Sequence, residues 1–242
     1  MKKALKITAA VTAVLLIAGI LWVYNGFCGN IFSAMYAKSQ IEKYIDETYP
    51  NNDYEVGDAR YSFKFDEYYC KITDPDSEDG SFNATYGRNG NITDDYEEAV
   101  KNLGNTIYRL DDGLRKSLEP LIASYFDEDE QEFGFATVIG DKAVDRSRLY
   151  LDMKFDVKNM PVETFIYGSV KGNSQKGLAR MKKMAEELKA MGYRIDYYSF
   201  SNDIDYFDNV PVDELMEAAD ADALAEYRLS DDKPKDKYDS LA

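Results

Sequence analysis

Residues 54–86 read YEVGDARYSFKFDEYYCKITDPDSEDGSFNATY and contain three short stretches that favour β-strands. Apolar and polar side chains alternate in the first two, at Tyr61, Phe63 and Phe65 and then at Tyr68, Cys70 and Ile72. The third stretch is followed by Gly-Arg-Asn-Gly at residues 87–90, which contains the Asn-Gly pair typical of hairpins. The pattern therefore predicts an antiparallel meander with strands at 54–65, 68–73 and 81–86.

A helix is predicted on the N-terminal side of this meander. Between Ile31 and Tyr49 the apolar residues lie mostly along one side of a helix, and Pro50-Asn51-Asn52 ends the pattern. A helix followed by a three-strand meander is the order of a small α+β layer. We therefore expect an N-terminal domain over residues 31–92.

The C-terminal side repeats this order loosely. We expect helices at 93–125, 173–192 and 211–227 and strands at 133–139, 149–157, 162–170 and 193–200. The first helix is expected to begin at a Thr93-Asp94-Asp95 cap, and residues 149–157 show the cleanest half-buried strand pattern of the chain. The fold class is thus α+β with two small antiparallel-sheet-plus-helix layers, the second over residues 93–229 and a charged tail at 230–242. The pattern leaves open whether these are two domains or two layers of one body.

The N-terminus has the features of a membrane anchor. Residues 7–24 carry no charge, and their length matches the roughly 20 apolar residues that a transmembrane helix needs. Trp22 and Tyr24 stand where an interfacial aromatic belt would lie, and Lys2, Lys3 and Lys6 precede the span. We expect residues 1–24 to form a cytoplasmic stub and a single transmembrane helix, with the remainder of the chain outside the cell. Cleavage as a signal peptide is the alternative, although no Ala-x-Ala-like site follows closely.

Composition excludes several classes of function. The chain has no histidine, which removes Ser-His-Asp and Cys-His catalysis and the usual zinc sites. Three of the 29 basic residues precede residue 25, so residues 25–242 carry 26 basic and all 45 acidic residues, a net charge of −19. Such an acidic body repels nucleic acid and anionic membrane surfaces. We expect no nucleic-acid partner.

Two acidic stretches are the candidates for metal binding, and neither makes a convincing site. Asp74 to Gly80 resembles the start of a calcium loop, but Asp79 stands where glycine is required and Thr85 where a bidentate glutamate is required. Asp127 to Glu132 is a run of like charge, which is usually a solvated link. We therefore predict solvated turns, with no metal ligand, no cofactor and no catalytic residue assigned.

The two cysteines leave one question open. Cys28 follows the apolar segment directly and Cys70 falls in a predicted strand, so they form either a disulfide or two separate thiols. A lipoprotein site at Cys28 is disfavoured because Phe27 occupies the position where a small residue is required.

The sequence also resembles a known family. The residues that carry the likeness are Tyr24-Asn25-Gly26-Phe27-Cys28-Gly29-Asn30, the helix end Tyr49-Pro50, and the aromatic run from Tyr61 to Tyr69. They are similar to the YfjL-like proteins, membrane-anchored or exported proteins of Gram-positive bacteria with N-terminal and C-terminal α+β regions. The resemblance implies a Gram-positive source and brings no established activity or functional residues.

The function that these features favour is a non-enzymatic interaction module at the outer face of the cell membrane, binding another envelope protein or a peptide. The absence of a catalytic motif, the anchor and the acidic folded body all point that way. One alternative is an envelope enzyme that acts on wall polymer through paired carboxylates. Another is a weak divalent-cation binder at residues 74–80.

Overall fold

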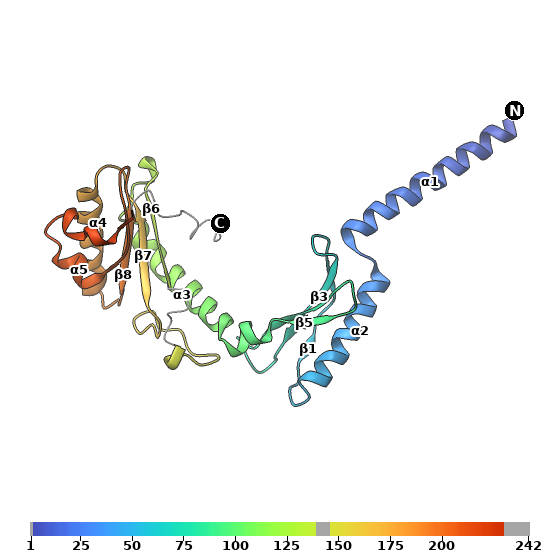
Figure 1. Ribbon diagram of the computed structural model, residues 1–242, viewed down its shortest axis with the longest axis horizontal. Coiled ribbons are helices and arrows are strands. Elements are labelled where there is room, and N and C mark those ends of the chain that lie inside the picture. The colour runs from blue at the N-terminus through green and yellow to red at the C-terminus, as the bar shows by residue number, and fades with distance from the viewer. Residues whose placement is uncertain (1, 139–145, 230–242) are drawn as a thin grey trace. The chain divides into compact units, whose positions relative to one another are not determined.

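The computed structural model describes residues 2–138 and 146–229, without some side chains of the first helix. It is an α+β protein with two sheets, and the chain divides into two compact units, residues 1–105 and 106–242. The two are described separately below (Figure 1). The expected tail at 230–242 lies outside the described residues.

The first unit begins with helix α1 (Lys2–Cys28), which contains the expected membrane segment. Among the residues that the structure describes, no helix has the length and apolarity needed to cross a membrane. The side chains of Trp22 and Tyr24, the expected interfacial aromatics, lie outside the described residues. The expected single-pass span at 7–24 falls within α1.

Helix α2 (Ile31–Thr48) confirms the predicted helix. The side chain of Asn30 caps it by accepting hydrogen bonds from the backbone N–H groups of Phe32 and Ser33, at 2.8 and 3.4 Å. Its buried stripe consists of Ala37, Ile41 and Ile45. This spacing of four residues turns one face of α2 toward the sheet.

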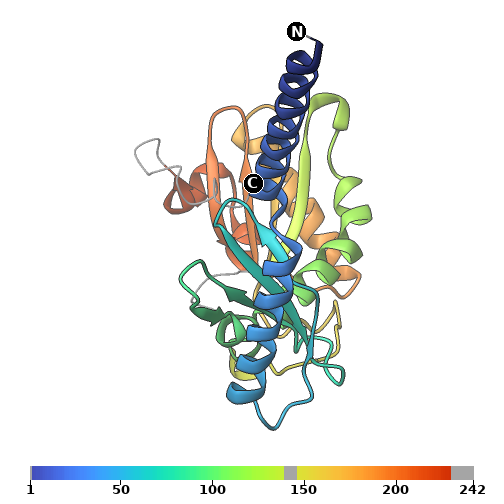
Figure 2. The same ribbon diagram turned by 90° about the vertical axis from the view of Figure 1, so that its right-hand side faces the viewer.

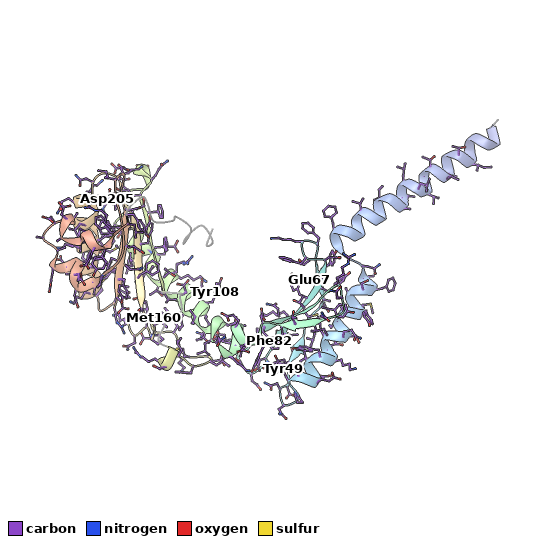
Figure 3. All side chains as sticks on the ribbon, viewed as in Figure 1. Tyr49, Glu67, Phe82, Tyr108, Met160 and Asp205 are labelled. Carbon is purple, nitrogen blue, oxygen red and sulfur yellow. The ribbon has the colours of Figure 1, made fainter. Side chains whose placement is uncertain are left out.

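The first sheet is antiparallel throughout. Its strands are β1 (Glu55–Val56), β2 (Arg60–Ser62), β3 (Glu67–Thr73), β4 (Phe82–Tyr86) and β5 (Ile92–Asp94). They lie in the order β1-β3-β4-β5, and β2 also pairs with β3. Cys70, Ile72, Phe82 and Ala84 are buried, and α2 packs against β3 and β4 (Figure 1). Tyr49 and Phe82, labelled in Figure 3, meet at the end of α2 with ring centroids 5.5 Å apart.

Three expectations for this unit are corrected. The predicted strand at 54–65 is two short strands, and Phe63 and Phe65 lie in the turn that follows. The predicted helix cap at Thr93-Asp94 belongs to β5, which pairs with β4, so the expected boundary between residues 92 and 93 falls inside a strand. A π-helical turn (Glu97–Lys101) then leads to α3 (Gly104–Ala123).

The second unit is built on a mixed sheet (Figure 2). Its strands are β6 (Phe133–Val138), β7 (Thr164–Ser169), β8 (Tyr197–Ser201), β9 (Tyr206–Pro211) and β10 (Arg228–Leu229), in the order β10-β9-β8-β7-β6. Helix α4 (Ser174–Ala190) connects β7 to β8, which are parallel, and the other pairs are antiparallel. The expected purely antiparallel layer is therefore wrong, because a helical crossover returns the chain in the same direction.

One face of this sheet carries the core. Alternate residues of β7 are buried, among them Ile166 and Gly168, and a Cβ at Gly168 would lie 2.6 Å from the Met181 methyl group of α4. Leu178, Met184 and Leu188 of α4 are also buried, as are Leu110, Leu114, Leu118 and Ile122 of α3. Asn173 caps α4 and Gly192 follows it with φ +83°, both as predicted.

Two predictions for the second unit are wrong. Residues 149–157 alternate in burial, yet they form turns rather than a strand, with Asp152 at φ +58°. The expected helix at 211–227 is instead the end of β9, a short α5 (Val212–Glu217) and a 3₁₀ helix (Ala221–Tyr227). Phe207 of β9 stacks on Phe200 of β8 at 4.6 Å, which ties this segment to the sheet.

Candidate interaction site

The second sheet presents a face of partly exposed aromatic side chains, here called the aromatic face: Phe133, Phe135, Tyr167 and Tyr206. The strand register brings them together. Phe135 pairs with Tyr167, Phe133 with Ser169, Ser169 with Ser201, and Ser201 with Tyr206. Because side chains alternate between the two faces of a strand, this face lies opposite the buried Ala136 and Ile166.

The rings of the aromatic face form a continuous row. Their centroids are 5.7 Å apart for Phe133 and Tyr167, 5.4 Å for Phe135 and Tyr167, and 6.2 Å for Tyr167 and Tyr206. Phe133 is 52% exposed and Phe135 is 37% exposed. The hydroxyl groups of Tyr167 and Ser201 lie 2.7 Å apart and share a hydrogen bond, which fixes the central ring. A rigid aromatic row loses little conformational entropy when a partner covers it.

Hydroxyl and carboxylate groups border this row. Ser199 pairs with Tyr167 across the β7–β8 ladder and is therefore on the same face. Its hydroxyl donates to Asp208 Oδ1 at 3.2 Å and accepts from the backbone N–H of Asn209 at 2.9 Å. Ser199 is buried, so these hydrogen bonds tie β8 to β9 beside the aromatic row.

The first unit contains a groove of about 510 Å³. Its walls are the first turns of α2, the β2–β3 hairpin and the β4–β5 turn, and its lining includes Tyr36, Tyr61, Asp66, Tyr86 and Arg88. Tyr61 donates to Asp66 Oδ1 at 2.7 Å, and Arg88 Nε lies 3.4 Å from Asp66 Oδ2. The pKa of Tyr61 is raised mainly by the hydrogen bond to Asp66 and to a smaller extent by burial.

This groove does not match the site expected of a wall-polymer hydrolase. Among the described residues that line it, Asp66 is the one carboxylate. Glycoside hydrolysis by paired carboxylates requires two, held several ångströms apart across the scissile bond. The groove is lined instead by tyrosine rings and by the ion pair between Arg88 and Asp66.

The predicted solvated link at 127–132 is wrong for its last residue. Glu132 is buried, and its carboxylate accepts from the backbone N–H groups of Asp127 and Lys171 at 3.1 and 3.0 Å. It also accepts from Lys176 at 3.2 Å and from Arg180. Burial alone raises the pKa of Glu132, but these four donors outweigh it and lower the pKa to about 2. Glu132 therefore stays ionised and joins β6 to α4.

The acidic turn at 74–80 is only partly as predicted. Asp74 Oδ1 accepts from the backbone N–H of Asp76 at 2.9 Å, as in an Asx turn, whereas Asp79 is buried. Asn105 donates to the carbonyl groups of Asp79 and Ser81 at 2.8 and 2.5 Å. Within the described residues, no group of three or more acidic or cysteine side chains is arranged to hold a metal ion.

The structure describes one of the two cysteines. Cys70 is a free thiol that is fully buried in the first sheet, and burial raises its pKa to about 11. The side chain of Cys28 lies outside the described residues, but because Cys70 is a free thiol the structure favours separate thiols over the disulfide alternative.

Sequence reasoning did not single out the aromatic face, although a signal was present. On β6 the aromatic residues Phe133 and Phe135 alternate with the small residues Gly134 and Ala136. Large aromatics on one side and small residues on the other indicate a strand whose small side is pressed against helices. A Cβ at Gly134 would lie 2.3 Å from the Phe126 ring, which confirms that close packing.

Comparison with known proteins identifies the first part of the chain. Residues 2–96 match the family model described as YfjL-like, N-terminal domain. Residues 2–96 are therefore similar to the N-terminal domain of the YfjL-like family. The match covers α1, α2 and β1 to β5, and it confirms the resemblance noted from the sequence. Comparisons with curated proteins and with solved structures find no match.

Proposed function

We propose that this YfjL-like protein is a non-enzymatic interaction module that α1 anchors in the cell membrane. Its N-terminus lies in the cytoplasm, and its two folded units lie outside the cell. The aromatic face binds another envelope protein or a peptide there.

The proposed anchor is supported by the chemistry of α1. The apolar side chains of α1 that the structure describes are exposed, including those of the consecutive residues Val14, Leu15, Leu16 and Ile17, which point in different directions around the helix. A helix that is apolar on every side needs an apolar environment around it, which a bilayer supplies. The lysines at positions 2, 3 and 6 favour a cytoplasmic N-terminus.

The observation that carries the proposed binding is the aromatic face. A soluble unit of net negative charge gains nothing from exposing a row of aromatic rings unless a partner covers it. Phenylalanine and tyrosine are both enriched in the cores of protein interfaces, and tyrosine is enriched among the residues that dominate binding energy. Phe135 is an exposed ring of this row, with its centroid 5.4 Å from that of the central ring, Tyr167.

The test is site-specific crosslinking in intact cells. A photo-reactive phenylalanine analogue replaces Phe135 in the full-length chain, and the same analogue replaces Tyr108 as the matched control. Tyr108 is an aromatic residue of the same unit, on α3, and is 75% exposed (Figure 3). We expect one defined protein or peptide adduct at Phe135 and none at Tyr108.

A substitution measures the contribution of the face. Phe135→Ser, made in the chain without the photo-reactive analogue, removes one exposed ring of the face and is expected to lower co-purification of the partner that the crosslink identified by about tenfold or more, as for a residue that dominates binding energy. Tyr108→Ser is expected to leave recovery unchanged. Equal recovery with both variants, or no specific adduct at position 135, would contradict the proposal.

A further inference from the structure

The turn between β2 and β3 carries two exposed phenylalanines around a lysine, here called the hairpin tip: Phe63, Lys64 and Phe65. Phe63 is 63% exposed and Phe65 is 64% exposed. The turn is a defined structure, because Ser62 O accepts from the backbone N–H groups of Phe65 and Asp66 at 3.3 and 2.8 Å. The Lys64 ammonium lies 5.2 Å from the centroid of the Phe65 ring.

The hairpin tip is held beside the C-terminal end of α1. The rings of Phe27 and Phe63 have centroids 5.6 Å apart. Gly29 has φ +73°, and a Cβ there would lie 2.6 Å from Tyr61 Cβ, so the α1–α2 junction is in direct contact with β2. The backbone N–H of Asn30 donates to the Tyr68 hydroxyl at 2.9 Å, which ties the junction to β3 as well. Figure 1 shows this hairpin next to the end of α1.

The start of α2 extends the same apolar surface. Ile31, Phe32, Met35 and Tyr36 are all exposed, although α2 buries its other face on the sheet. Aromatic side chains mixed with a lysine are the composition of protein surfaces that sit at the membrane–water interface. At such surfaces the aromatic rings enter the acyl boundary, while the lysine ammonium group stays among the lipid headgroups.

We infer that the hairpin tip inserts into the outer leaflet of the bilayer next to α1 and forms a second membrane contact that orients the first unit. This inference rests on the proposed anchoring of α1. A lipid surface is the occupant that the observations favour, since the tip is continuous with the end of the anchor helix. Residues 25–242 carry a net charge of −19, so the contact is apolar rather than electrostatic.

Tryptophan fluorescence of the full-length chain tests both the insertion of α1 and the insertion of the hairpin tip. The wild-type chain has one tryptophan, Trp22, which lies in α1. The purified chain is reconstituted into phosphatidylcholine vesicles with or without bromine on the acyl chains, because bromine quenches only a tryptophan that reaches the hydrocarbon region. Quenching of Trp22 reports insertion of α1.

A second protein places the reporter in the hairpin tip. In the Trp22→Phe background, Phe63→Trp moves the single tryptophan to the tip, and Asn51→Trp moves it to the exposed turn after α2. The 18 residues of α2 separate the two positions by about 27 Å of helix. We expect brominated lipid to remove roughly half of the Phe63→Trp emission, as for a ring buried 5–10 Å into the interface. The Asn51→Trp emission is expected to be unchanged by brominated lipid.

The possible outcomes separate the inference from the proposed anchor. If Trp22 is not quenched, the anchor itself fails. If Trp22 is quenched and Phe63→Trp is quenched no more than Asn51→Trp, the anchor stands and the inference is overturned. A blue-shifted Phe63→Trp emission that brominated lipid does not quench means that protein, such as a second copy, covers the tip, and this also overturns it. Circular dichroism of each variant, matched to wild type, shows that the substitutions leave the fold intact.

Discussion

Glu132→Gln tests how the second unit is held together, because it removes one charge and almost no volume from a buried site. The wild-type carboxylate accepts from two backbone N–H groups and from the cationic side chains of Lys176 and Arg180. Glutamine keeps one carbonyl oxygen but directs an amide N–H₂ group at the cations. Removing one partner of a buried ion pair leaves the other charge uncompensated, which is the costly case.

The size of the effect follows from the pKa. The donors lower the pKa of Glu132 from 4.5 to about 2, which at 1.36 kcal/mol per unit corresponds to roughly 3 kcal/mol of stabilisation of the ionised form. Water screens part of this interaction, since the side chain of Lys176 is 43% exposed and that of Arg180 is 21% exposed. We therefore expect Glu132→Gln to lower the free energy of unfolding of the second unit by about 2–3 kcal/mol.

The matched control is Glu130→Gln, which removes the same kind of charge from the same lysine. Glu130 lies 3.2 Å from Lys176 Nζ, as Glu132 does, but its side chain is 51% exposed. We expect it to contribute less than about 1 kcal/mol, as exposed ion pairs do.

Hydrogen–deuterium exchange of the full-length chain in detergent micelles is the assay. Peptides from β6 and α4 should exchange about 30- to 140-fold faster in Glu132→Gln, because each 1.4 kcal/mol is a tenfold change in the opening equilibrium. Peptides from β3, in the other unit, should keep the wild-type rate. If Glu132→Gln and Glu130→Gln accelerate exchange equally, the buried carboxylate of Glu132 stabilises the unit no more than the exposed carboxylate of Glu130 does. That result would refute the reasoning.

The same residue makes the second unit acid-sensitive. The pKa of Glu132 is lower in the folded than in the unfolded chain. Its contribution to the free energy of unfolding is therefore complete above about pH 4.5 and is lost as the pH falls through about 2. The difference in exchange between wild type and Glu132→Gln should vanish over that range. Gly29→Ala should destabilise the α1–α2 junction by about 1–3 kcal/mol, because φ +73° and the approach to Tyr61 both disfavour a side chain. Gly26→Ala, where a Cβ would meet nothing within 4 Å, should not change exchange of the β2 and β3 peptides, and equal exchange in both variants would contradict the assignment. Cys70 is fully buried with a pKa of about 11, so a maleimide at pH 7 should modify it only after denaturation. Peptide mass spectrometry checks this, and rapid labelling of the native chain would count against it.

The elements that the sequence predicted well carry their own boundary signals. Helix α2 follows from a single apolar stripe that Asn30 starts and Pro50 stops, and α4 follows from a stripe between Asn173 and Gly192. These signals act over one or two turns, so local chemistry decides them without knowledge of the rest of the fold.

The wrong predictions have a common cause. A pattern of buried and exposed residues does not show which strand, if any, pairs with the segment. Residues 149–157 have the expected alternation of exposed and buried side chains, but no neighbouring strand pairs with them among the described residues. Phe63 and Phe65 alternate correctly and are nevertheless in a turn. Strand β9 has the opposite problem, because a bulge opposite Tyr198 and Phe200 breaks its alternation.

The site residues were hidden for a similar reason. Phe133 and Phe135 were placed in a strand, but their row with Tyr167 and Tyr206 exists only through the register of four strands. Glu132 ended a run of acidic residues and was read as solvated. Its burial depends on cations that lie 44 and 48 residues further along the chain.

The charge and the exposed aromatic surfaces together constrain how this protein finds what it binds. A net charge of −19 on residues 25–242 repels anionic lipid and acidic proteins at separations up to about the Debye length, roughly 8–10 Å. Attraction therefore has to come from contact, and the two surfaces proposed above for that contact, the aromatic face and the hairpin tip, are both apolar. If α1 holds the chain at the membrane, the tip no longer has to overcome this repulsion by diffusion, because the anchor keeps its local concentration at the bilayer high. The anchor does not bring the partner of the aromatic face to this chain. That partner must therefore reside in the envelope itself or be cationic enough to approach.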